Sequence, residues 1–211
     1  GGAVKLPPNV HYPYVDFLMP GIFVQTTVFG SIATAVGLAT DIKSGLLERF
    51  RSLPMARSAL LAGRTTADLA RNVIVVILML AVGLAVGFRI HTNVLALLAG
   101  LGLVLLFGYT MSWVFAAVGL AVGDPETAQA AAFPVMAPLV FASSAFIPVS
   151  TMPSWLQGFA AHQPVSVTAS AVRALVDGGA TTSNVIQTLA WCIGILVVFA
   201  PLAVRRYRRA V

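Results

Sequence analysis

Charged side chains are scarce in this sequence, and their scarcity decides its class. Of the 211 residues, 58% are apolar and only 9% are charged, whereas a soluble domain carries roughly 25% charged residues. So few ionic groups cannot cover the surface of a folded chain in water. The composition therefore excludes a soluble enzyme and favours an integral membrane protein.

Catalytic and metal-binding motifs are missing as well. The sequence contains no G-x-x-x-x-G-K-[ST] phosphate loop, no H-E-x-x-H motif and no G-x-S-x-G motif. Its single cysteine, Cys192, allows neither a disulfide within the chain nor a cysteine-based zinc site. The histidines His11, His91 and His162 are scattered over predicted loops. We therefore expect no catalytic residue, no metal ligand and no cofactor in this chain.

Long apolar runs are present instead. A helix needs about 20 apolar residues to cross the hydrocarbon core of a bilayer, and five segments reach that length. They predict an all-α fold class, a polytopic membrane helical bundle that forms one domain over 1–211. The predicted spans are 16–40, 65–88, 94–122, 126–146 and 183–204.

The fourth predicted span, 126–146, begins and bends at identifiable residues. Asp124 is expected to cap its N-terminus, and Pro125 suits the first helical position. Inside the span, Pro134 and Pro138 each remove a backbone donor. This predicts a kinked or locally opened helix.

Basic residues lie at the ends of the spans and predict the orientation. Nine of them fall in the 41–64 loop and the 205–211 tail, against three at the other ends. Because an excess of Lys and Arg marks the cytoplasmic side, the loop and the C-terminus are expected inside a bacterial plasma membrane. This placement explains the net charge of +6 without a nucleic-acid partner. Segment 1–15 is then an outer loop, which predicts a further span upstream and six spans in the parent protein.

The segment 147–182 is too broken by proline for a span and too apolar for a free loop. Trp155 and Phe159 lie one helical turn apart and give it an apolar stripe. We predict two short amphipathic helices near the outer interface. They would be re-entrant only where protein or a wet cavity surrounds their backbone.

The span interiors are expected to lack ionisable side chains, which normally mark ion and proton pathways. Asp68 and Arg71, near the cytoplasmic end of the 65–88 span, are spaced to pair at i, i+3. Energy for any transport would therefore arrive from elsewhere, most naturally through the 41–64 loop.

The 41–64 loop contains an amphipathic segment. Leu46, Leu47, Phe50 and Leu53 share one helical face, and Pro54 ends the helix. Such a helix can dock on a cytoplasmic partner or rest on anionic membrane lipid, and the pattern does not decide between the two.

Polar and aromatic side chains within the spans suggest a cavity for an amphiphilic substrate. Hydrogen bonds between packed helices explain most such residues as well. Glycine spacings at Gly83/Gly87 and Gly119/Gly123 allow close helix approach, either within one subunit or between two. The candidate substrate-path residues are Gln25, Thr26, Phe29, Thr34, Phe133, Met136 and Phe141.

Two motifs together resemble the ABC type-2 permease family. The run "DIKSGLLERFRSLPMARSALLAGR" has the family's acidic residue, glycine-containing amphipathic helix, "SLP" and following basic residue. The run "FIPVSTMPSWLQGFAAHQPVSVTASAVRALVDGG" is similar to the family's Met-Pro-x-Trp-Leu segment, further proline and Ala-x-Arg-x-Leu. The segments "YVDFLMPGIFVQ" and "ERFRSLPMARSA" resemble the daunorubicin-resistance (DrrB-like) branch most.

The resemblance implies a permease subunit, without enzyme activity of its own, that exports a hydrophobic drug, polyketide or complex lipid. It implies a second permease subunit, expected as a homodimer, and two separate ATPase subunits that bind ATP and Mg. The implied coupling helix comprises Asp41, Lys43, Gly45, Leu46, Glu48, Arg49, Phe50, Arg51, Ser52, Leu53 and Pro54. The implied outer gate comprises Pro148, Pro153, Trp155, Pro164 and Arg173.

Two other functions are compatible with the same residues. A membrane scaffold without a transport cycle would show no ATP hydrolysis stimulated by a substrate in any complex. A membrane-embedded enzyme fits less well, because the spans offer no buried acid, base or metal ligand.

Overall fold

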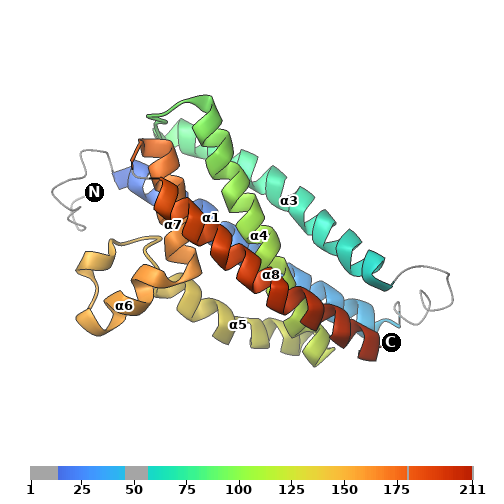
Figure 1. Cartoon of the computed structure of the whole chain (residues 1–211). Helices are drawn as coiled ribbons and strands as arrows, with labels where there is room; N and C mark the ends of the chain where they lie inside the picture. The colour runs from blue at the N-terminus through green and yellow to red at the C-terminus, as the bar shows by residue number, and fades with distance from the viewer. Residues whose placement is uncertain (1–13, 46–56, 180, 211) are drawn as a thin grey trace.

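The structure is a computed structural model that describes residues 14–45, 57–179 and 181–210, and this part of the chain is helical without strands (Figure 1). The predicted all-α class is thus confirmed. The helices are α1 (Tyr14–Lys43), α3 (Arg57–Val86), α4 (Val94–Val122), α5 (Pro125–Phe141), the short 3-10 helix η1 (Val149–Thr151), α6 (Ser154–His162), α7 (Pro164–Asp177) and α8 (Thr182–Ala210).

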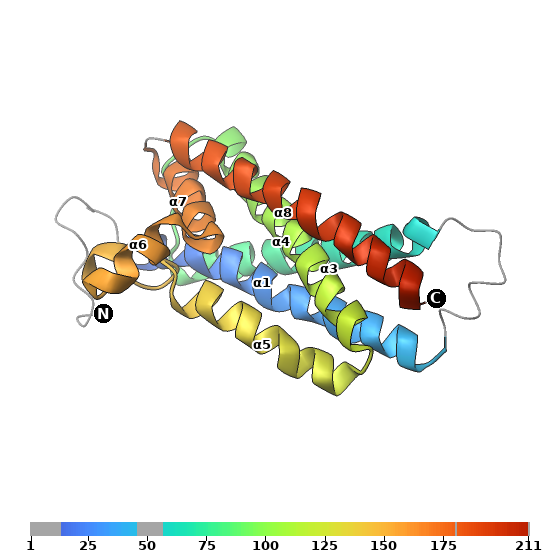
Figure 2. The ribbon, with the colours of Figure 1, turned by 60° about the horizontal axis from the view of Figure 1, so that its bottom comes forward.

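The core of the bundle lies around α4, which packs against α1, α3, α5, α7 and α8. Its side chains Phe107, Met111 and Phe115 are almost fully buried, and they meet Phe23 and Val28 of α1 in one apolar cluster. A helix that is apolar on all faces is stable only in such a central position or in lipid. Figure 2 shows α1 and α4 at the centre, with α5 and α8 on either side of them.

Four of the helices are long and apolar enough to cross a membrane: α1, α3, α4 and α8. The helices α3 and α8 turn large apolar side chains outward. Ile74 and Leu78 of α3 and Val197 of α8, for example, are each more than 60% exposed. Such surfaces are costly in water and favourable against lipid tails. The bundle is therefore that of a membrane protein.

Three predicted boundaries differ from the structure. The 126–146 span ends early, because α5 stops at Phe141 after 17 residues and the chain then turns through a polar Ser-Ser pair. The 41–64 loop is shorter than predicted, since α1 continues to Lys43 and α3 already begins at Arg57. Residues 57–64 favour this extension because Ala and Leu are good helix formers and no proline interrupts them. The tail is not separate either: α8 continues to Ala210.

Close helix contacts involve one glycine of the Gly119/Gly123 spacing. A Cβ at Gly119 of α4 would overlap the backbone of Ala35 in α1, so this glycine lets the two helices touch. Gly123 has a different role: it ends α4 with a φ of 73°, a conformation that glycine adopts at low cost. Within this chain Gly119 therefore serves packing between α1 and α4, and Gly123 serves to end the helix.

Candidate functional site

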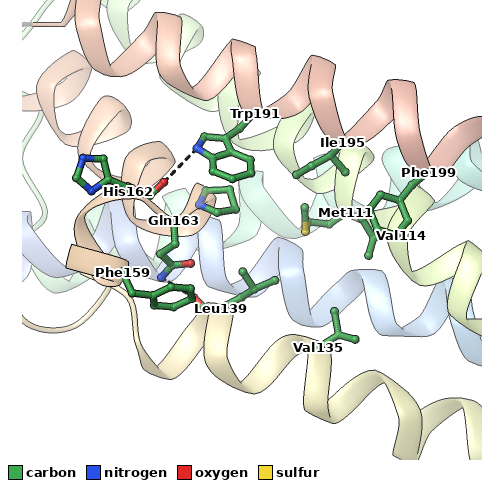
Figure 3. Close-up of a pocket in the computed structure, with 11 residues that line it drawn as sticks. Met111, Val114, Val135, Leu139, Phe159, His162, Gln163, Trp191, Ile195 and Phe199 are labelled. Carbon is green, nitrogen blue, oxygen red and sulfur yellow. Dashed lines mark hydrogen bonds between the residues drawn. The ribbon is translucent and has the colours of Figure 1, made fainter. Parts of the chain in front are cut away.

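A pocket of about 410 Å³ lies between α4, α5 and α8 and is closed at one end by α6 and α7. Both α5 and α8 pack on α4, and they make little contact with each other, which leaves this space between them. Figure 3 shows the side chains that face it. They are mostly apolar and come from five helices: Met111, Val114, Val135, Leu139, Phe159, His162, Gln163, Pro164, Trp191, Ile195 and Phe199.

Gln163, between α6 and α7, is the buried polar residue of the pocket wall. It is 3% exposed, and its side-chain amide nitrogen donates to the carbonyl oxygens of Leu139 (3.0 Å) and Ala142 (3.1 Å). These bonds fasten the end of α5 to the start of α7. Its other amide atom, Oε1, has no hydrogen-bond partner among the described residues. No local sequence pattern marks this residue.

The end of the bundle that carries α6 and α7 is held together by Arg173. Its guanidinium donates to the carbonyl oxygens of Phe17 (2.8 Å), Ser144 (2.7 Å) and Ala145 (3.0 Å), and it lies 3.9 Å from the centroid of the Phe17 ring. One side chain thus joins α7 to α1 and to the turn after α5. Its planar guanidinium carries five donors in a fixed fork and reaches carbonyls on two elements at once, a geometry that the compact ammonium of lysine does not provide.

The other predicted gate residues lie in the same region but have different environments. Pro148 and Pro153 precede η1 and α6, and Pro164 is buried at the start of α7. Trp155, on α6, is 79% exposed. The predicted pair of short helices in 147–182 is therefore confirmed as α6 and α7. The gating role of these residues stays a prediction.

Arg173, Asp16 and Asp177 form a cluster of charged side chains at this end of the bundle. His91 approaches Asp177, with a distance of 3.9 Å between Nδ1 and Oδ1. Burial raises the pKa of Asp177 to about 6, and repulsion from Asp16 adds to this effect, whereas His91 and Arg173 oppose it. Asp177 therefore changes its charge near neutral pH.

The opposite end, here called the basic end, carries the last turn of α1, the start of α3 and the end of α8 (Figure 1). There Arg64 of α3 pairs with Asp41 of α1, and Lys43 pairs with Asp124 at 2.7 Å. Asp124 also caps α5 as predicted, because its carboxylate accepts from the Thr127 amide at 3.1 Å. The Lys43 ammonium and these Thr127 donors lower the pKa of Asp124 to about 2.

The predicted coupling segment is only partly described. Asp41 and Lys43 lie in the last turn of α1, and Gly45 follows it with a φ of 68°. The ion pair with Arg64 fixes the spacing of α1 and α3 at the point where the segment leaves the bundle. The remaining members lie outside the described residues: Leu46, Glu48, Arg49, Phe50, Arg51, Ser52, Leu53 and Pro54.

A polar network joins α1 and α3 inside the bundle. Asp68 is 7% exposed; it accepts a 2.5 Å hydrogen bond from Thr34 and pairs with Arg71 at 3.3 Å. Arg71 also donates to the carbonyl oxygen of Gly30 at 2.7 Å. The predicted Asp68–Arg71 pair is confirmed, but the prediction that the span interiors lack ionisable groups is wrong for Asp68. The carboxylate is tolerated there because it is paired and hydrogen-bonded.

The predicted substrate-path residues do not meet in one place. Thr34 is committed to Asp68, and Met136 is 2% exposed within the core. Phe29, Phe133 and Phe141 are 40% to 66% exposed on the outside of the bundle. Gln25 and Thr26 are half-buried on α1. None of the seven lines the pocket; helix periodicity could not separate them because neither α1 nor α5 has a distinct polar face.

In the described part of the chain, no group of three or more His, Cys, Asp or Glu residues could hold a metal ion. His91 faces Asp177, while the carbonyl oxygen of His162 accepts from the Trp191 indole at 3.1 Å. Cys192 is buried. His11 lies outside the described residues.

These features define a polytopic helical membrane protein whose described part holds an apolar pocket and no catalytic constellation. The chain belongs to the ABC-2 type transporter family, whose family model matches residues 6–176. It is therefore a membrane permease.

Drug-resistance permeases are among its relatives. The chain is 36% identical over 195 residues to the daunorubicin resistance ABC transporter permease DrrB1 of Streptomyces coeruleorubidus, an alignment that covers 92% of this chain and 69% of the relative. It is 32% identical over 194 residues to the probable doxorubicin resistance ABC transporter permease DrrC of Mycobacterium tuberculosis, covering 92% and 70%. The predicted resemblance to the daunorubicin-resistance branch is thus confirmed.

Proposed function

We propose that this chain is the permease subunit of an exporter that moves a hydrophobic or amphiphilic compound out of a bacterial cell. An anthracycline-like drug, a polyketide and a complex lipid are the candidate cargoes. The observation that carries the proposal is family membership, together with the resistance function in the names of its relatives. The apolar pocket between α4, α5 and α8 supports a cargo of this polarity.

The basic end is proposed to face the cytoplasm. Lys43, Arg205 and Arg206 are exposed there, and cytoplasmic ends of membrane helices are enriched in Lys and Arg. The opposite end, with α6 and α7, would then lie at the outer surface and carry the gate. The C-terminus would be cytoplasmic.

Energy is proposed to enter at the basic end, through the coupling segment 41–54. A separate ATPase that binds ATP and Mg would push on this segment, and the Asp41–Arg64 pair would pass the movement to α1 and α3 together. Two permease chains with two ATPase subunits complete the proposed assembly. Asp68 does not alter the proposal that the energy comes from an ATPase, because its carboxylate is paired with Arg71 and hydrogen-bonded to Thr34 within the bundle.

Reconstitution tests the proposal. The full-length protein is co-expressed with the ABC ATPase encoded nearest to its gene, purified, and placed in proteoliposomes. We expect a stable complex whose ATP hydrolysis rises when daunorubicin, a polyketide or a long-chain lipid is added. A complex that hydrolyses ATP at the same rate with every compound, or no complex at all, would favour a scaffold without a transport cycle.

A further inference from the structure

The amide of Gln163 has a fixed orientation. Its nitrogen donates to two backbone carbonyl oxygens, those of Leu139 and Ala142, and also reaches the Ser166 hydroxyl at 3.3 Å. Carbonyl oxygens only accept hydrogen bonds, so exchanging the amide oxygen and nitrogen would set oxygen against oxygen twice. Oε1 is therefore the atom that is buried without a donor among the described residues.

A buried acceptor without a donor costs roughly 1–3 kcal/mol, and such atoms are rare in folded chains. Gln163 belongs to the wall of the pocket (Figure 3). Oε1 itself is buried, so a ligand reaches it only when a neighbouring side chain turns aside. Phe159 of α6, which is 49% exposed, is that side chain, whereas the Trp191 indole is held by its hydrogen bond to the carbonyl oxygen of His162.

The other side chains of the pocket wall indicate which kind of compound fits the pocket. Aromatic rings of Phe159, Trp191 and Phe199, together with the thioether of Met111, face a space of about 410 Å³, a size within the range of small-molecule sites. Aromatic faces and methionine sulfur favour flat ring systems. A phospholipid acyl chain would fill the space but offers no hydrogen-bond donor to Oε1.

We propose that the pocket between α4, α5 and α8 binds an apolar compound with a ring system, through a hydrogen bond from a hydroxyl or amine of that compound to Oε1 of Gln163. The compound enters from the bilayer between α5 and α8, which make little contact with each other. This deepens the export function proposed above and rests on it for the fate of the compound. Binding itself needs neither ATP nor an ATPase.

A pair of probes isolates the hydrogen bond. Pyrenylmethanol and its methyl ether share the same ring system, but only the alcohol has a donor hydrogen. Binding to the full-length protein in phospholipid nanodiscs is followed by energy transfer from Trp191, with Trp113 and Trp155 replaced by Phe. We expect the alcohol to bind about tenfold more tightly than the ether, as one hydrogen bond to a buried acceptor would give.

Two variants complete the test. Gln163→Leu should reduce the preference for the alcohol to about onefold, whereas a purely structural loss would weaken both probes equally. Val135→Phe should weaken the binding of both probes by filling the pocket. Val197 is 66% exposed on α8 and lies outside the pocket, so Val197→Phe should leave the binding of both probes unchanged.

Equal affinities of the two probes for the unmodified pocket would overturn the proposal, as would tight binding that Val135→Phe does not weaken. Both outcomes are independent of the export function. A protein that binds the alcohol selectively but shows no ATPase-driven transport would retain this site and lose the proposed function. A transporter that binds the two probes equally would retain the proposed function and lose this site.

Discussion

Two sides of the bundle differ in how tightly they are packed. On one side, α1, α4 and α7 form a seam whose side chains, such as Phe23, Phe107 and Val165, are at most 1% exposed. On the other side, α5 and α8 flank the pocket and turn much of their surface outward. Only 11% of the most apolar stretch of α8 is buried, against 50% for α1. The side formed by α5 and α8 is here called the flank. The seam stabilises the fold, and the flank leaves room for a ligand.

Polar contacts add to the packing of the seam. Arg173 of α7 donates to the backbone of α1 and of the turn after α5, and Asp68 of α3 accepts from Thr34 of α1. Buried polar atoms without a partner among the described residues occur on both sides, at Asp16 and Trp113 in the seam and at Gln163 in the pocket wall. The difference between the two sides is therefore one of packing. The predictions below test this division through the free energy of unfolding, measured in detergent.

The largest effect is expected at Arg173. Replacing it by Met leaves the carbonyl oxygens of Phe17, Ser144 and Ala145 without its donors, and hydrogen bonds from charged groups contribute roughly 1.5–3 kcal/mol each. We expect a loss of about 3 kcal/mol or more, read as a fall in the midpoint of thermal unfolding. Arg173→Lys should recover only part of it. A stability equal to that of the unmodified protein would show that the seam does not depend on this residue.

A smaller loss is expected from Gly119→Ala. The added methyl group would overlap Ala35 and push α1 away from α4, which we expect to cost about 2 kcal/mol, within the range for overpacked sites. Gly102→Ala on the same helix is the matched control, because a Cβ there meets nothing within 4 Å. Equal stabilities of the two variants would contradict the close contact in the seam.

The pH dependence of stability should reveal Asp177. Its pKa is raised from the ordinary value of 3.8 to about 6 in the folded protein, so the folded state holds the proton more tightly than the unfolded state. The stabilisation is full below about pH 4 and is lost as the pH rises through about 6. Asp177→Asn should flatten the profile of unfolding midpoint against pH between these values. A profile of unchanged slope would assign the dependence to another group.

The smallest effect is expected on the flank. Val135→Phe adds volume where the pocket already provides space, so the free energy of unfolding should change by less than about 0.5 kcal/mol, whereas overpacking a filled core costs roughly 1–3 kcal/mol. Val28→Phe, at a fully buried position of α1, is the comparison in the seam. A loss at Val135 as large as that at Val28 would abolish the distinction between the two sides.

The sequence predicted the helices well where one local signal decides. The apolar run predicted over 94–122 matches α4 at both ends, and Asp124 caps α5 as its position before Pro125 indicated. The Asp68–Arg71 pair followed from its i, i+3 spacing. In each case the residues that make the structure are neighbours in the chain.

The pocket could not be predicted in this way. Gln163 acquires its role from the ends of α5 and α7, and the Arg173 contact with Phe17 joins residues 156 positions apart. The exposure of Phe133 and Phe141 could not be predicted either, because α5 has no distinct polar face and lipid favours the same residues as a protein interior. The roles of Arg49 and Arg51 rest on the family resemblance and stay predictions.

The central claim is that a separate ATPase drives this permease through the segment between α1 and α3. The most direct test is ATP-dependent uptake of daunorubicin, or of the compound that most stimulates the reconstituted ATPase, into inverted membrane vesicles. Vesicles with the unmodified complex are compared with vesicles carrying Arg49→Glu and Arg51→Glu in the permease. Equal permease content and an unchanged unfolding midpoint in both samples are the controls. We expect uptake to fall at least tenfold in the variant, and uptake at the unmodified rate would contradict the account.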